Sequence, residues 1–147
     1  MAIIMSNKMD KNKIIRGSFG AVWLDGEELG SVKSFEAKVT LEYEDVDIMG
    51  ELGKSKRYMG FTGEGTMTLH KIDSTIGKLL ADGIRNGNMP DFKIVAKLDD
   101  PTAYGAERVE LTGVTISELM ALKFENKALR EEEVPFNFSH FRYIDMI

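Results

Sequence analysis

Few residues of this sequence could carry out chemistry, and they are scattered along the chain. His70 and His140 are the two histidines, and each lies at a strand-like position without a companion at the spacing of a metal site. The chain has no cysteine, which excludes a disulfide, a thiolate nucleophile and a cysteine-based zinc site. No serine lies in a G-x-S-x-G elbow. We therefore expect no catalytic residue, metal or cofactor, and we interpret each histidine as a polar-face or partly buried side chain.

Two short motifs resemble reactive sites by composition only. The stretch GFTGEG, residues 60–65, is glycine-rich like a phosphate loop, but no strand-to-helix transition follows it and the Lys-Ser/Thr end of a P-loop is missing. The run REEE, residues 130–133, places three carboxylates in a row, but neighbours on an extended chain point to opposite faces. A solvated acidic run explains it better than a metal site or an acid–base pair does. The sequence thus predicts a protein that is not an enzyme.

The length of the chain and its net charge restrict the class of protein further. A chain of 147 residues fits one domain with its own core. The net charge of −5 argues against a protein that grips nucleic acid by neutralising phosphates. The apolar start of the chain is interrupted by Asn7, Lys8 and Asp10, too soon for a signal peptide or a membrane anchor. We expect a mobile N-terminal arm over residues 1–17 and a domain over residues 18–147.

Alternating residues predict a β-hairpin with two different faces. An Asp25-Gly26 turn first joins two short strands. From residue 35 to residue 44 apolar and polar residues then alternate, and the same parity returns over residues 61–70. Antiparallel pairing of these two stretches would create one apolar and one polar face. The polar face would carry Glu36, Lys38, Glu42, Glu44 and Glu64.

The connection inside this hairpin is long and apolar. Hairpins need two to five connecting residues, whereas the predicted loop 45–57 has about a dozen. Its aliphatic side chains would leave apolar area in water in a soluble monomer. Unless they complete the core of the monomer, we expect a partner to cover them. They are Val46, Ile48, Met49 and Leu52.

One helix and three further extended stretches complete the pattern. The helix is predicted over residues 73–88, with Asp73 or Ser74 as its cap and Gly87 at its end. Its apolar stripe is Ile76, Leu79, Leu80 and Ile84. The extended stretches cover residues 91–100, 107–125 and 131–144, with a bulge expected at Gly113 and an edge or bulged position at Pro135. The sequence predicts a mainly β fold, an antiparallel sandwich or barrel of about six or seven strands with one α-helix.

Four longer strings resemble a known family. They are VWLDGEELGSVKSFEAKVTLEYEDVDIMGE, GEGTMTLHKIDS, ERVELTGVTISE and EEEVPFNFSHF. In this order they resemble successive blocks of the tail tube proteins of PBSX-like contractile-tailed phages and of R-type phage-tail-like bacteriocins. The similarity covers roughly residues 18–141, which is nearly the whole domain. The N-terminal arm matches no part of the pattern.

The resemblance implies an assembly as well as a fold. It implies the phage tail tube fold, similar to that of type VI secretion tube proteins, and hexameric rings that stack into a tube inside a contractile sheath. The long loop would contact neighbouring subunits or the adjoining ring. The implied partners are further copies of the chain, the sheath and the baseplate. The implied location is a virion or a phage-tail-like particle assembled in the bacterial cytoplasm.

The polar hairpin face would line the channel of such a tube. Its excess of carboxylates, repeated around the ring, would repel a phosphate backbone, so DNA would pass without specific binding. In a bacteriocin the same tube would instead puncture the target envelope. A non-contractile tail tube and a type VI tube share this logic and stay open as alternatives. A monomeric ligand-binding β-barrel would explain the strands and the helix but not the long loop.

Overall fold

A computed structural model of the chain describes residues 10–30, 32–70, 75–119, 121–122 and 125–146. Eight strands and one α-helix lie in this part, together with the short 3₁₀ helices η1 (Lys11–Lys13) and η2 (Gly17–Phe19). The longer elements are β1 (Gly20–Leu24), β2 (Glu27–Glu28), β3 (Val32–Asp47), β4 (Lys54–His70), α2 (Thr75–Asn86), β5 (Phe92–Leu98), β6 (Glu107–Ile116), β7 (Glu131–Phe138) and β8 (His140–Asp145). The mainly β class with one α-helix is confirmed, with β2 and β8 as short additions.

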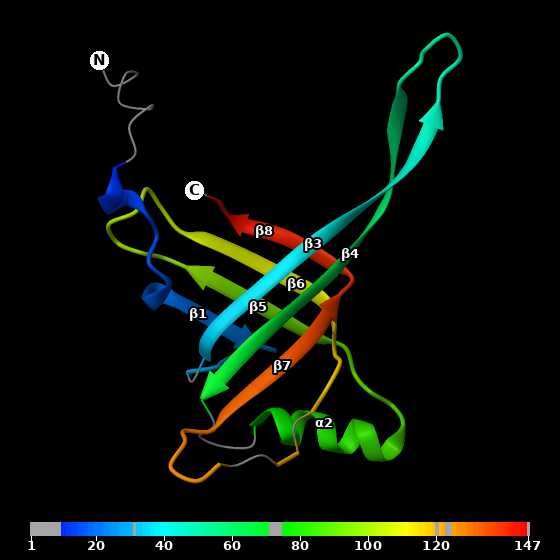
Figure 1. Cartoon of the computed structure of the whole chain (residues 1–147). Coiled ribbons are helices and arrows are strands. Elements are labelled where there is room, and N and C mark those ends of the chain that lie inside the picture. Colours follow the sequence, from blue (N-terminus) through cyan, green and yellow to red (C-terminus); the bar gives the residue numbers. More distant parts are fainter. Residues whose placement is uncertain (1–9, 31, 71–74, 120, 123–124, 147) are drawn as a thin grey trace.

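The strands follow one antiparallel path that folds into two layers. The order is β2-β1-β5-β6-β7-β4-β3, and β8 pairs with β6 from the side. Figure 1 shows β1, β5, β6 and β8 in one layer, with β3, β4 and β7 crossing it in the other. Helix α2 lies at one end of both layers. The arrangement is an open sandwich because β2 and β3 end the path without pairing with each other.

Strand β6 joins the layers by changing partners at Gly113. Residues up to Thr112 pair with β8 and residues up to Val114 pair with β5, whereas Thr115 and Ile116 pair with β7. The register shifts at this point, and Gly113 has φ +64°, a conformation that side chains disfavour. The bulge expected at Gly113 is therefore confirmed. It turns the sheet back on itself so that the two apolar faces meet.

Strand β7 confirms its predicted faces. Val134, Phe136 and Phe138 are buried against the core. β7 pairs with β4 along its whole length but with β6 through two residues only. Pro135 lies where the β6 ladder stops, and its carbonyl accepts a hydrogen bond from the backbone of Ser117. A proline is tolerated there because no donor is required from it.

The core lies between the layers and under α2. It gathers Val22, Leu24, Met67, Leu69, Ile76, Leu80, Phe92, Ile94, Leu111, Val114, Val134, Phe136 and Phe138.

Helix α2 packs on this core with most of its predicted stripe. Ile76 and Leu80 are buried and Leu79 packs against the core, but Ile84 is exposed, so that part of the prediction is wrong. The inward position of the last turn is Gly83, where the space is taken by Met89. The helix ends as expected before Gly87, which has φ +70°. The predicted caps, Asp73 and Ser74, lie outside the described residues.

The β3–β4 hairpin is longer than the sequence indicated. The predicted loop 45–57 is wrong in its bounds, since the two strands pair until Asp47 meets Lys54 and only residues 48–53 connect them. Pairing continues because opposite charges face each other, with Asp45 and Lys56 joined by an ion pair of 2.5 Å. This ladder consists of polar residues, so the alternation of apolar residues does not reveal it.

The outer half of the hairpin extends past the layer that covers its base. Phe35 and Val39 pack against the core, but Leu41 and Tyr43 are each 51% exposed, so the predicted apolar face is dry only near its start. A register shift between Glu42 and Tyr43 marks where the hairpin leaves the body. Figure 1 shows this outer half, residues 42–59, projecting beyond both layers. We call it the distal arm.

Gly65 provides a test of how closely β4 packs against the neighbouring strands of its own layer. A Cβ added there would collide with the backbone oxygen of Glu36 and lie 2.6 Å from the ring of Phe136. We expect Gly65→Ala to lower the free energy of unfolding by about 1–3 kcal/mol because neither neighbour can move freely. Gly53→Ala, with no atom near its Cβ, should change it by less than about 0.5 kcal/mol. Urea titrations of both variants measure this, and equal stabilities would contradict the packing argument.

Candidate functional site

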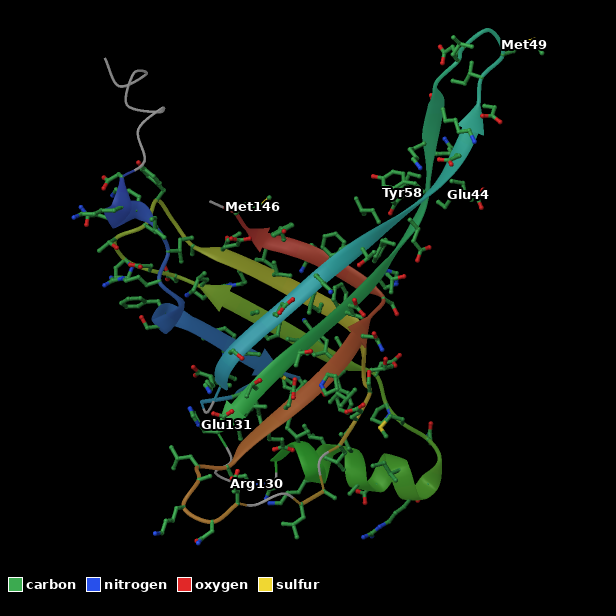
Figure 2. The ribbon with its side chains drawn as sticks, viewed as in Figure 1. Glu44, Met49, Tyr58, Arg130, Glu131 and Met146 are labelled. Atoms are coloured by element: carbon green, nitrogen blue, oxygen red, sulfur yellow. The ribbon has the colours of Figure 1, made fainter. Side chains whose placement is uncertain are left out.

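The tip of the distal arm presents the four aliphatic residues that the sequence singled out. Met49 and Leu52 are fully exposed, and Val46 and Ile48 are about 40% exposed. Figure 2 shows Met49 at the far end of the hairpin, well away from the body. Such a cluster leaves apolar area in water that a contact with another molecule would bury. The monomer therefore does not use these residues to complete its core.

A band of exposed aromatic and aliphatic side chains runs from the tip back to the body. Tyr43 and Tyr58 stack edge to face with ring centroids 5.9 Å apart. Phe61 of β4 contacts Phe141 of β8 at 5.7 Å, and both rings remain more than one-third exposed. Because β8 belongs to the other layer, this contact joins the two layers where the hairpin leaves the body.

An open groove continues this band between the layers. Its volume is about 620 Å³, and it runs between the apolar face of β3 and the strands β5, β6 and β8. Val39 and Leu41 line one side, and Leu98, Val109 and Tyr143 line the other. The body and the distal arm thus share one continuous apolar surface.

The opposite face of the hairpin is polar and charged. The register places all five predicted residues, Glu36, Lys38, Glu42, Glu44 and Glu64, on this face. Lys38 Nζ lies 3.5 Å from Glu64 Oε1 in the adjoining strand. The hydroxyl of Thr62 donates a hydrogen bond of 2.6 Å to Glu42. These contacts are exposed, so they orient the side chains more than they stabilise the fold.

The structure adds residues to this face that the sequence did not indicate. Arg57 lies opposite Glu44 on β4, and the pairing of β4 with β7 brings Glu133 opposite Thr68. By the same register Glu131 lies opposite His70 on this face, and Lys33 pairs with it at 2.7 Å. The face therefore carries six carboxylates and three cations. They come from Glu36, Glu42, Glu44, Glu64, Glu131 and Glu133, and from Lys33, Lys38 and Arg57. The cation-rich stretch KSKR, residues 54–57, was the sequence signal that could have indicated a basic residue such as Arg57 on the hairpin. The position of Glu133 depends on long-range register and had none.

A buried ion pair holds the described part of the N-terminal arm. Arg16 Nε donates to the carboxylate of Asp100 at 2.8 Å, and its backbone nitrogen donates to the same carboxylate at 3.0 Å. The side chain of Asp100 is fully buried and also accepts from Thr102. The hydrogen bond from Arg16 holds the pKa of Asp100 well below its usual range despite burial. Arg16 is therefore tied to the turn after β5, whereas the mobility of the N-terminal arm stays a prediction.

A second charged cluster ties the strands of one layer together. Glu110 on β6 accepts from Arg142 on β8 at 2.5 Å and lies 3.1 Å from Lys93 on β5. Hydrogen bonding from Arg142, and then from Lys93, lowers the pKa of Glu110. The cluster spans three neighbouring strands, and its ion pairs join them.

The residues considered for chemistry remain isolated. His70 and His140 are exposed, at the end of β4 and the start of β8. Within the described residues, no three side chains of the metal-binding types gather around a common point. The one helix there, α2, is too short and too polar to cross a membrane.

Comparison with known proteins identifies the family of the chain that carries this surface. A model of the phage tail tube protein family matches residues 7–145. The chain belongs to that family. Two relatives from Bacillus subtilis (strain 168), the phage-like element PBSX protein XkdM and the uncharacterized protein YqbM, are each 38% identical over 130 residues. Each alignment covers 86% of this chain and 88% of the relative.

Solved structures share the fold of this tail tube protein at low sequence identity. The tube-terminating cap of the anti-feeding prophage aligns with a TM-score of 0.74 at 11% identity, covering 97% of this chain and 98% of that one. A chain of the PVC sheath–tube complex, an extracellular contractile injection system in its extended state, aligns at 0.71 with 9% identity and 99% coverage of both. The tail tube fold expected from the sequence is confirmed.

Membership of this family settles the class of protein. A tail tube protein is a structural component of a phage tail or a phage-tail-like particle, so the chain is not an enzyme. The ligand-binding β-barrel is set aside on the same ground. The open groove is then surface available to an assembly.

The clamp between Arg16 and Asp100 predicts how the arm responds to acid. Because the folded pKa of Asp100 is depressed, its stabilisation is complete above the unfolded pKa of about 4 and is lost as the pH falls through the lower folded value. The protection factor of the Arg16 amide, which compares its exchange rate with the intrinsic rate at the same pH, should therefore stay constant down to about pH 4 and fall only at lower pH.

Substitution tests the same clamp at neutral pH. Asp100→Asn should expose the arm, so that trypsin cleaves after Lys13 and Arg16 several-fold faster. Asp99→Asn, at an exposed neighbour, is the matched control and should leave cleavage unchanged. Release of the arm between pH 6 and 5, or equal cleavage of both variants, would contradict the assignment.

Proposed function

We propose that the chain forms hexameric rings that stack into the inner tube of a contractile tail or phage-tail-like particle. The observation that carries this proposal is the distal arm. It projects from the body with an apolar tip, an exposed aromatic band and paired charges, all on a rigid hairpin. A monomer gains nothing from such an arm, whereas a polymer buries it repeatedly.

The comparisons support a contractile particle with a sheath and a baseplate. The similar folds come from contractile injection systems, among them a sheath–tube complex and the baseplate of the anti-feeding prophage. A relative at 38% identity is a protein of the phage-like element PBSX. On this proposal the outer surface of the ring meets the sheath, and the end of the tube meets the baseplate.

The tip is proposed as the contact with another subunit. Val46, Ile48, Met49 and Leu52 lie together at one end of the arm, too far out to reach the groove of their own subunit. A neighbouring subunit in the same or the adjoining ring would cover them. Burial of such side chains stabilises a contact by about 25 cal/mol for each Å² removed from water.

The polar face is proposed as the wall of the channel. In a ring the apolar face of the hairpin turns toward the protein body, which leaves the charged face toward the axis. Its six carboxylates and three cations repeat in every subunit, and a closed ring concentrates their field inside. A negative wall repels a phosphate backbone, which lets DNA pass without binding. In a particle without DNA, the same rigid tube would puncture an envelope.

Assembly of the purified protein tests the proposal directly. Size-exclusion chromatography and electron microscopy should show six-fold rings or hollow tubes, and association should increase with protein concentration. A monomer at every concentration, in the full-length chain and with its native N-terminus, would count against the proposal.

Substitutions at the tip test its role in assembly. Ile48→Asp with Met49→Asp should block tubes, because each carboxylate would enter an apolar contact at a cost of several kcal/mol. The fold should be unaffected because both side chains lie outside the core. Leu129→Asp changes another exposed leucine in the same way and is the control. Electron microscopy measures tube length, and normal tubes from the double variant would show that the tip is not the contact.

Charge reversal on the polar face tests its role in transport. Glu42→Lys with Glu64→Lys leaves four carboxylates against five cations, which turns the net charge of the face positive. A DNA-delivering particle should then eject more slowly, and salt should restore part of the rate because the Debye length falls from about 8 Å to about 3 Å at 1 M. Glu27→Lys with Glu28→Lys, on β2, is the control. Unchanged ejection from normal tubes would place this face elsewhere.

A further inference from the structure

The distal arm separates its charges by strand. On β3, residues 42–47 contain four carboxylates and no basic side chain; on β4, residues 54–57 contain three cations and no carboxylate. Within one hairpin the two sets face each other, since Asp45 bonds Lys56, Glu44 lies opposite Arg57 and Asp47 lies opposite Lys54. One side of the arm is therefore acidic and the other side is basic.

Both sides of the arm are unpaired strand edges. β3 ends the strand order, so no described strand pairs with its outer edge. β4 pairs with β7 only from Gly63 onward, which leaves the edge over residues 54–62 without a described partner. Unpaired edges are ready templates for another strand, and natural proteins protect or use them.

Rotation in a ring brings these two edges together. If the ring axis runs roughly along the strands, the outer part of β3 in one copy faces the uncovered part of β4, residues 54–62, in the next copy and is antiparallel to it, while β7 lies between them at the base. The contact is head-to-tail, which closes into a ring under rotation. Residues 42–47 then approach residues 54–57 of the neighbour at similar height. Each acidic strand would be flanked by basic strands on both sides, and no like charges would meet.

Resting on the ring assembly proposed above, we propose that the acidic β3 edge and the basic β4 edge are the two halves of a subunit contact. Their charge order selects the neighbour: a copy joins a ring only if its basic strand meets an acidic strand. The partner is thus a second copy of this chain with the same charge order. A hairpin that used these charges only for its own stability would show no such selectivity.

A variant with exchanged charges separates these two roles. Six changes, Glu44→Lys, Asp45→Lys, Asp47→Lys, Lys54→Glu, Lys56→Glu and Arg57→Glu, reverse the net charge of both strands but keep each opposite pair within the hairpin. This exchanged protein should form rings by itself. Mixed with the original protein before assembly, it should be excluded from the original's rings, because every mixed junction places like charges side by side.

Native mass spectrometry of rings assembled from two mass-labelled proteins measures the selectivity. We expect rings of a single type to be at least about tenfold more frequent than random mixing gives, with the excess falling at 1 M salt. A control exchange at the ion pair between Lys97 and Asp99, Lys97→Glu with Asp99→Lys, should mix at random with the original protein. Rings in which the original and the exchanged protein mix at random would overturn the proposal. This holds even if such mixed rings then stack selectively.

A second pair of variants keeps the test decisive if the exchanged protein does not fold. Glu44→Lys, Asp45→Lys and Asp47→Lys make both strands basic, and Lys54→Glu, Lys56→Glu and Arg57→Glu make both acidic. Each should form rings at least about tenfold less readily alone than the two do together, because only alternating neighbours pair opposite charges. Lack of rescue on mixing would overturn the proposal. Absence of rings from the original protein would instead reject the ring assembly itself, and this inference with it.

Discussion

A mismatch in length governs the architecture of this protein. The β3–β4 hairpin is far longer than the layer it packs against, so its base is part of the core and its outer half lies in solvent. Apolar residues near the start of β3 meet β7 and the core, whereas the same face farther along meets nothing in the subunit. The exposed apolar band, the open groove and the projecting tip all follow from this mismatch.

The body of the subunit has its own stabilising contacts. The bulge at Gly113 folds one continuous sheet over itself, and close contacts at Gly65 allow the rings of β7 to approach β4. The helix covers one end with Ile76 and Leu80, and the pair of Arg16 and Asp100 ties the chain before β1 to the turn after β5. None of these features involves the arm. Assembly contacts can therefore change without loss of the fold.

The arm combines two kinds of interaction that do different work in an assembly. Burial of apolar side chains at the tip is strong but has little directional preference. Opposite charges on the two strands contribute less energy at an exposed site, yet in the proposed ring they would distinguish a correct neighbour from a wrong one. A tube built from one kind of subunit needs both, because stacking must be stable and the junctions must repeat without error.

The sequence determined the local features of this protein. Alternation of apolar and polar residues predicted the strands. Glycine positions predicted the Asp25-Gly26 turn, the bulge at Gly113 and the end of the helix at Gly87. Each of these features depends on residues close together in the chain. The strings in four of its segments identified the family. Local pattern could not place the end of the hairpin, since charged pairs such as Asp45 and Lys56 extend the ladder without apolar alternation. Nor could it place Glu133 on the charged face, find the contact of Arg16 with Asp100, or show that Ile84 is exposed. Those depend on the register and the relative length of elements distant in the chain, and only packing in three dimensions decides them.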